Sequence, residues 1–105
     1  MAAPKSDKAA IRQVIRALRK AGYTITGGHD GDDFFEVEPD VSEDVLINDY
    51  LTVCDDSTLH TWKDDAEPRN SHVYFVLGND PEEVVCDYGV SLSPVLDPLT
   101  DGWWE

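Results

Sequence analysis

The first strong pattern of apolar positions lies near the N-terminus and predicts an amphipathic helix. Ser6 is a favourable N-cap residue, and Gly22 is a common helix terminator. Between them, apolar residues recur at three- and four-residue intervals, which places them on one side of a helix. The members of this arc are Ile11, Val14, Ile15 and Leu18, extended by Ala10, Ala17 and Ala21. We expect this arc to pack against a core.

The next segment alternates apolar and polar side chains in two short runs, Tyr23–Thr26 and Phe34–Glu38. Such alternation is typical of strands that are buried on one face. Residues 27–32 lie between the runs and are rich in Gly and Asp, the residues that tolerate positive φ in tight turns. The pattern predicts a β-hairpin.

A second helix is predicted after Pro39. Asp40 and Glu43 have the spacing of a capping box, and the helix that they open extends to about Val53. One broad arc of this helix is apolar, which indicates a core helix. Its members are Leu46, Ile47, Tyr50, Leu51, Val53 and Cys54.

Three more strands are predicted at Thr58–Lys63, His72–Leu77 and Glu83–Val90, separated by a polar loop and a turn. On the last of them, alternation places Val84, Cys86, Tyr88 and Val90 on one face. The element order is therefore α-β-β-α-β-β-β. It predicts an α+β fold in which two helices pack on one face of an antiparallel sheet of about five strands.

The C-terminal residues complete a single predicted domain, 1–105. Pro94 and Pro98 disfavour a long helix or a central strand, so residues 91–105 are predicted to be an irregular tail packed on or near the body. Trp103 and Trp104 have two interpretations. They form an exposed aromatic contact for a partner, or they fold back and close the core, which we favour.

The basic and acidic residues are concentrated in different parts of the chain. Residues 1–20 hold six Lys or Arg against one acid, a net +5, and residues 21–105 hold two against twenty-one, a net −19. On the first helix the cations form a stripe beside the apolar arc. The stripe either contacts nucleic-acid phosphates or lies over the acidic body, and the small local charge beside −19 favours the second interpretation. The candidate basic contacts are Arg12, Arg16, Arg19 and Lys20.

The acids also have two interpretations. A high net charge commonly serves solubility alone, whereas carboxylates gathered on one face could bind a basic protein surface and even mimic nucleic acid. Acids near the predicted hairpins are the candidates for such a face: Asp32, Asp33, Glu36, Glu38, Asp64, Asp65, Glu82 and Glu83.

Motifs for other chemistry are weak. Residues 29–33 offer His and Asp ligands but do not match a calcium loop, and the three histidines lack metal-ligand spacing. Cys54 and Cys86 stand in apolar sequence, which predicts free, buried thiols rather than nucleophiles. We therefore predict no enzyme, catalytic residue, metal or cofactor. A nucleic-acid-binding accessory protein is the first alternative, and a small enzyme or metal protein is the second.

One stretch resembles a known group. The run HVYFVLGNDPEEVVCDY from His72 to Tyr88, followed by Leu92 and residues 94–99, resembles small bacteriophage and prophage proteins of unassigned function. The basic first helix, ending in Ala21-Gly22-Tyr23, is similar to their N-terminus. The resemblance implies a phage protein acting in the cytoplasm of a bacterial host, where such products often bind and inhibit host proteins in host takeover.

No apolar run suits a signal peptide or a membrane span. We expect an acidic protein, monomeric or homodimeric, that binds a basic surface of a host or phage protein.

Overall fold

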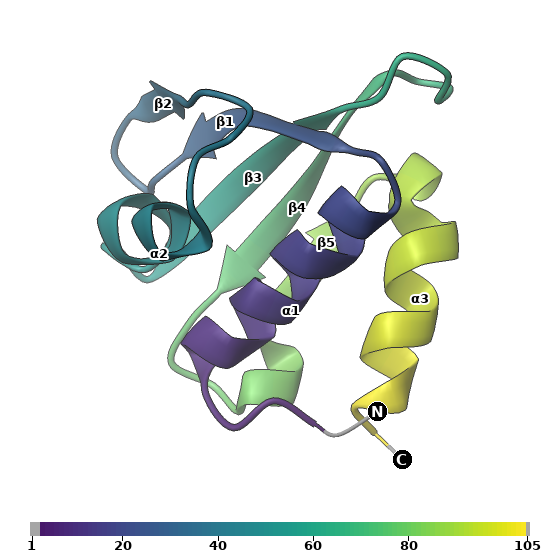
Figure 1. Cartoon of the computed structure of the whole chain (residues 1–105). Coiled ribbons are helices and arrows are strands. Elements are labelled where there is room, and N and C mark those ends of the chain that lie inside the picture. The colour runs from purple at the N-terminus through teal and green to yellow at the C-terminus, as the bar shows by residue number, and fades with distance from the viewer. Residues whose placement is uncertain (1–2, 105) are drawn as a thin grey trace.

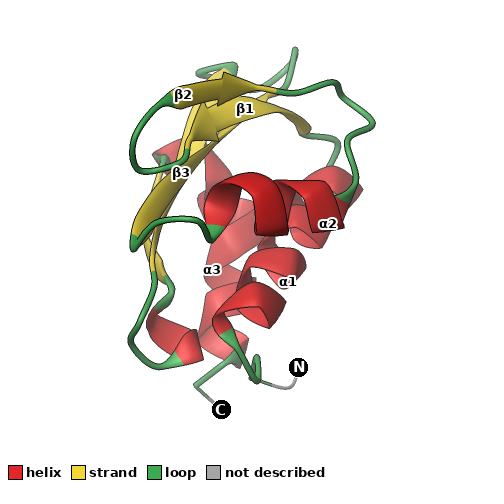
Figure 2. Cartoon of the chain, turned by 90° about the vertical axis from the view of Figure 1, so that its left-hand side faces the viewer, coloured by secondary structure: helices red, strands yellow, loops and turns green. Residues whose placement is uncertain are grey.

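The computed structural model describes residues 3–104 and has two layers (Figure 1). A five-stranded antiparallel sheet of order β2-β1-β3-β4-β5 forms one layer, and helices form the other. Figure 2 shows that the helices all lie on the same side, so the other face of the sheet is open. The predicted α+β class is confirmed. In chain order the elements are α1 (Asp7–Lys20), β1 (Thr24–His29), β2 (Phe34–Glu36), α2 (Glu43–Val45), a π-helical segment (Leu46–Leu51), β3 (Asp56–Trp62), β4 (Asn70–Val76), a 3-10 turn (Pro81–Glu83), β5 (Val85–Tyr88), a second 3-10 turn (Val90–Leu92) and α3 (Ser93–Gly102).

Helix α1 forms as its sequence predicts. The Ser6 hydroxyl accepts a hydrogen bond from the Ala9 amide, which satisfies one of the free N–H groups of the first turn. Gly22 takes a positive φ of 91° directly after the helix. The predicted arc is fully buried at Ala10, Ile11, Val14, Ile15 and Leu18. The helix therefore covers the centre of the core.

The core lies between the helices and the inner face of the sheet. Leu59 pairs with Val73 across β3 and β4, and both are fully buried, as are Ile25 on β1 and Phe75 on β4. Because side chains alternate along a strand, the neighbours of these residues point to the open face. The strand pattern thus fixes which residues face solvent.

The predicted turn at residues 27–32 is wrong in its first half. Gly27 and Gly28 belong to β1, which extends to His29 and has an irregular register between Ile25 and Gly27. A Cβ atom on Gly28 would lie 1.9 Å from the Thr58 carbonyl oxygen. Neighbouring backbone therefore approaches too closely for any side chain, and the glycine is a packing requirement rather than a turn signal.

The second helix begins later than predicted. Ser42, not Asp40, is its N-cap, since the Ser42 hydroxyl accepts from the Val45 amide. The helical segment ends at Leu51, and the Thr52 hydroxyl donates to the Ile47 carbonyl at that end. Val53 lies beyond it and is half exposed.

The prediction of an irregular tail at residues 91–105 is wrong for its described part, because α3 is a third helix. Pro94 lies in the first turn, where no helical N–H bond is lost, and Pro98 removes one bond. Burial of an apolar stripe against α1 and the sheet compensates for that loss. The stripe consists of Leu92, Leu96, Leu99 and Trp103.

The last strand also departs from the expected alternation. Its register shifts between Tyr74 and Phe75, so that Val85 pairs with Phe75 and Cys86 lies in the irregularity. Cys86 is exposed, which corrects the prediction of a buried thiol, and Cys54 is half-buried. Both cysteines are free.

Candidate functional site

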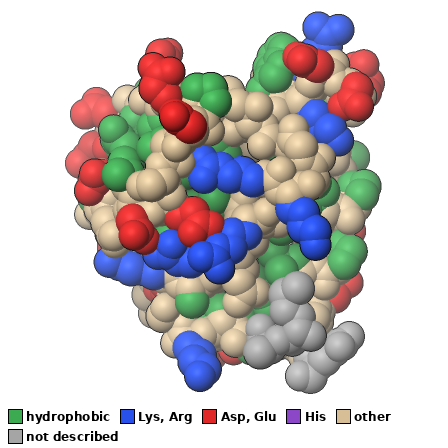
Figure 3. Space-filling model, viewed as in Figure 1, with side chains coloured by type: hydrophobic (Ala, Val, Ile, Leu, Met, Phe, Trp, Pro, Cys, Tyr) green, Lys and Arg blue, Asp and Glu red, His purple; other side chains and the backbone are tan. Residues whose placement is uncertain are grey.

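The open face of the sheet carries no cation. Within residues 3–104, the eight Lys and Arg residues lie before or within α1 or in the loop between β3 and β4, and no strand contains one. Alternation places the carboxylates of Glu36, Asp56 and Asp87 on this face instead. Figure 3 shows the opposite side, where Lys and Arg side chains gather over α1 and α2. The cations thus lie away from the strands of the open face, whereas acids also occur on the helix side.

All three histidines lie on the same open face. His60 on β3 pairs directly with His72 on β4, and His29 on β1 pairs with Thr58. Phe34 lies near two of them, with its ring centroid 4.8 Å from that of His29 and 6.3 Å from that of His60. Ligand spacing along the chain did not reveal this gathering. The predicted strand bounds did not give the register that places His60 opposite His72, because β4 begins at Asn70, two residues before the predicted start.

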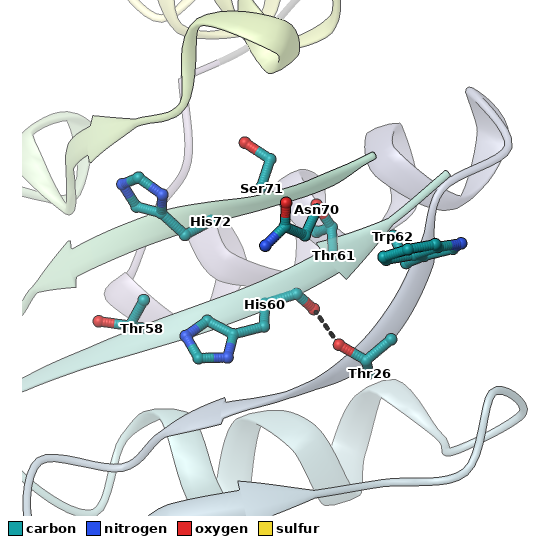
Figure 4. Close-up of a pocket in the computed structure, with 8 residues that line it drawn as sticks. All are labelled: Thr26, Thr58, His60, Thr61, Trp62, Asn70, Ser71 and His72. Atoms are coloured by element: carbon teal, nitrogen blue, oxygen red, sulfur yellow. Dashed lines mark hydrogen bonds between the residues drawn. The ribbon is translucent and has the colours of Figure 1, made fainter. Parts of the chain in front are cut away.

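A shallow depression of about 590 Å³ lies over β3 and β4 within this face (Figure 4). Trp62 stands at one end of it, and Thr58 and His72 stand at the other. The Trp62 indole is 40% exposed, and its Nε1 donates a 2.8 Å hydrogen bond to Asp64. The lining residues are Thr26, Thr58, His60, Thr61, Trp62, Asn70, Ser71 and His72.

The protonation of two groups on this face is shifted. Partial burial, reinforced by the nearby His72 and His29, lowers the pKa of His60. At neutral pH its imidazole is therefore uncharged and has one acceptor nitrogen. The hydrogen bond that the Tyr74 hydroxyl donates to Asp56, at 2.9 Å, raises the pKa of Tyr74. Near neutral pH both groups are therefore uncharged, so neither brings a charge of its own to the face.

In the loop at residues 29–33, the side chains of two candidate metal ligands accept hydrogen bonds from backbone amides of the same loop. The Asp30 carboxylate accepts hydrogen bonds from the Asp33 and Asp32 amides, which lower its pKa. The His29 Nδ1 accepts from the Gly31 amide at 3.1 Å. Among residues 3–104, no three His, Cys, Asp or Glu side chains are arranged to hold a metal ion.

The eight predicted acids do not form one cluster. Asp32 and Asp33 follow β1, whereas Asp64 and Asp65 follow β3 at the opposite end of the sheet. The paired stretch from Thr58 to Trp62 between these ends spans about 13 Å. Among the others, Glu36 lies on the open face, Glu38 follows β2, and Glu82 and Glu83 lie in the 3-10 turn beside α1.

The arginines of the basic stripe are bound within the chain. Arg12 contacts Glu43 at 3.0 Å and Asp44 at 2.6 Å, and Arg16 contacts Glu43 at 2.7 Å. Arg19 donates to the Val41 carbonyl at 2.6 Å. These three arginines therefore lie over the start of α2. Lys20, the fourth candidate, is exposed.

The ion pairs also shift the ionisation of their members. Hydrogen bonds from Arg16 and Arg12 lower the pKa of Glu43, although burial opposes the shift. Bonds to Asp44 and Glu43 raise the pKa of the Arg12 guanidinium. These charges join α1 to α2 rather than forming a free basic surface.

The two C-terminal tryptophans divide between the two interpretations. Trp103 is 3% exposed, and its Nε1 donates to the Gln13 side-chain oxygen at 2.9 Å, so it closes the core between α3 and α1. Trp104 is 65% exposed. It follows the C-cap residue of α3.

Comparison with known proteins gives no relative: no protein-family model, curated protein or solved structure matches the chain. The resemblance to phage proteins stays a prediction. Among the described residues, none of the helices combines the length and the apolar character that a bilayer crossing requires.

Proposed function

We propose that the chain is a non-enzymatic interaction protein whose open sheet face binds a basic surface on a partner protein. The observation that carries the proposal is that, within residues 3–104, no strand of the sheet contains a Lys or Arg, in a chain of net charge −14. A cationic surface that approaches the strands meets the carboxylates of Glu36, Asp56 and Asp87, and Lys63 and Arg69 lie only in the loop that joins β3 to β4. The charge of the whole chain adds long-range steering.

Exposed aromatic side chains on the same face support binding rather than solubility alone. Phe34 is 77% exposed on the edge strand β2, and Trp62 is 40% exposed on the central strand β3. Solubility requires charges and is not served by exposed rings. Large aromatic side chains contribute much of the energy at protein interfaces. The rigid sheet holds them in place before binding, which reduces the entropy lost on association.

The same observations favour a protein over nucleic acid as the partner. Open sheets with aromatic rings also bind single-stranded nucleic acid, but those sites rely on cations that track the phosphates. This face has none, and Arg12, Arg16 and Arg19 on the other side are bound to the segment that begins α2. Because the eight predicted acids are spread over both ends of the sheet, we propose recognition of a basic surface without mimicry of a duplex. The phage resemblance supports a host or phage protein in the bacterial cytoplasm as the partner.

Binding of a defined cationic probe tests the proposal. The probe is a short peptide of alternating arginine and glycine, and its binding site is mapped from amide chemical shifts in the labelled protein. We expect shifts centred on β3 and β4, and affinity that falls as salt rises.

Two double variants that remove the same charge provide the matched comparison. Glu36→Gln with Asp87→Asn removes two of the three carboxylates of the open face, whereas Glu83→Gln with Asp101→Asn removes two exposed acids elsewhere. We expect the first pair to weaken binding several-fold and the second to change it little. Equal losses, or shifts centred on the helices, would show that the charge acts only as a diffuse field and would refute the proposed face.

A further inference from the structure

We propose that the depression between β3 and β4 is a subsite for one arginine side chain of the partner, an inference that rests on the proposed function. The depression lies at the centre of the cation-free face and is large enough, at about 590 Å³, for a single long side chain. Figure 4 shows Trp62 at one end and polar groups along both sides. Each feature of the lining matches the guanidinium group better than the ammonium group.

The first feature is the indole ring. Trp62 is held by the hydrogen bond from its Nε1 to Asp64, so its ring is oriented before any ligand arrives. A guanidinium group is planar and weakly hydrated, and it stacks on aromatic faces. The Asp64 carboxylate at the edge of the ring adds negative potential at the same end of the depression.

The second feature is a set of neutral acceptors. Asn70 offers an amide oxygen, and the hydroxyls of Thr26 and Thr58 offer lone pairs. The imidazoles of His60 and His72 can each supply an acceptor nitrogen while they are uncharged. A guanidinium group has five N–H donors in one plane, so it can donate to several of these acceptors at once. An ammonium group concentrates its charge at one point.

The third feature is the lack of a carboxylate in the lining itself. The lining residues are threonine, serine, asparagine, histidine and tryptophan. A strongly hydrated ammonium group would lose water on entry and gain no ion pair at contact distance. A guanidinium group loses less hydration and gains the stacking contact, so the site selects arginine over lysine.

Three peptides that differ at one position test the selectivity. The position holds arginine, lysine or citrulline, which keeps the planar shape of arginine without its charge, within an otherwise identical glycine- and serine-rich sequence carrying flanking lysines. Dissociation constants are measured by fluorescence anisotropy. We expect the arginine peptide to bind about fivefold to tenfold more tightly than the lysine peptide, and citrulline to lose affinity as well.

Variants assign the selectivity to the depression. Trp62→Ala should remove the preference for arginine, and Trp62→Phe should keep part of it, while Trp104→Ala, the loss of an exposed tryptophan elsewhere, should leave it unchanged. Denaturant unfolding of each variant verifies that it is folded. Equal binding of the arginine and lysine peptides, still weakened by the open-face charge variant, would overturn the arginine subsite and leave the proposed function standing. Failure of all three peptides to bind would overturn both.

Discussion

His60 and His72 lie directly opposite each other on β3 and β4, on the face of the sheet that no helix covers. In an antiparallel pair, side chains at this register are about 5 Å apart at their Cβ atoms, so two positive charges there repel each other. Together with burial, this proximity lowers the pKa of His60. His60 therefore remains uncharged at neutral pH.

Binding of a cationic partner should weaken at acidic pH. Acidification protonates His60, whose pKa is lowered by burial and by the nearby histidines, and so places positive charge on the face that is proposed to bind a cation. We expect the dissociation constant of the arginine peptide to rise about threefold to tenfold between about pH 7.5 and about pH 5.5. Fluorescence anisotropy across this range measures it. A His60→Gln, His72→Gln variant should flatten the profile, and an unchanged profile in that variant would count against the histidines.

Glu43 should stabilise the fold above acidic pH. It accepts hydrogen bonds from Arg12 and Arg16, so its folded-state pKa is lowered. A lowered carboxyl pKa contributes stability above the unfolded-state value of about 4.3, and this contribution is lost as pH falls through the folded-state value. Glu43→Gln should reduce the free energy of unfolding by about 1 kcal/mol at pH 7, and the difference should vanish at strongly acidic pH.

Urea unfolding of the two proteins as a function of pH measures this contribution. Glu83→Gln is the control, because Glu83 is exposed in the 3-10 turn before β5. A loss of stability in Glu43→Gln that persisted below the titration range would assign the effect to packing rather than charge.

The packing of α3 on α1 depends on Trp103 and not on its neighbour Trp104. Trp103→Ala removes a buried indole and its hydrogen bond to Gln13, so we expect a loss of about 3 to 4 kcal/mol in the free energy of unfolding. Trp104→Ala should change it by less than about 0.5 kcal/mol. Denaturant unfolding compares the two. Comparable losses would contradict the division between a core residue and a surface residue.

Most elements of the fold can be predicted from the sequence. The α1 arc, the five strands and the α+β class follow from periodicity, which local sequence displays directly. Local sequence does not predict α3, because Pro94 and Pro98 disfavour a helix, although Leu92, Leu96, Leu99 and Trp103 have helical spacing. Tertiary burial outweighed a local propensity. The helical spacing of these four apolar residues is the sequence signal that indicates α3 despite its two prolines.

The candidate site was less accessible to sequence reasoning. Its members lie far apart in the chain, and only strand register brings His29, His60 and His72 together. Register depends on the bulge in β1 and on the close contact at Gly28, neither of which local periodicity reveals. Among the predicted strands, only Thr58–Lys63 holds a cation, at its last residue, and this scarcity of Lys and Arg was the available sequence signal for the face.

The two cysteines should differ in reactivity. Cys86 is exposed at the irregularity in β5, whereas Cys54 is half-buried near Asp32, and burial followed by the nearby Asp32 and Asp30 charges raises the pKa of Cys54. Only the thiolate reacts with iodoacetamide, so the folded protein at neutral pH should be alkylated at Cys86 about tenfold faster. Mass spectrometry of peptides after timed quenching measures the two rates. In urea the two rates should converge, because unfolding removes the burial and the carboxylate contacts, and a difference that survived unfolding would contradict this structural explanation.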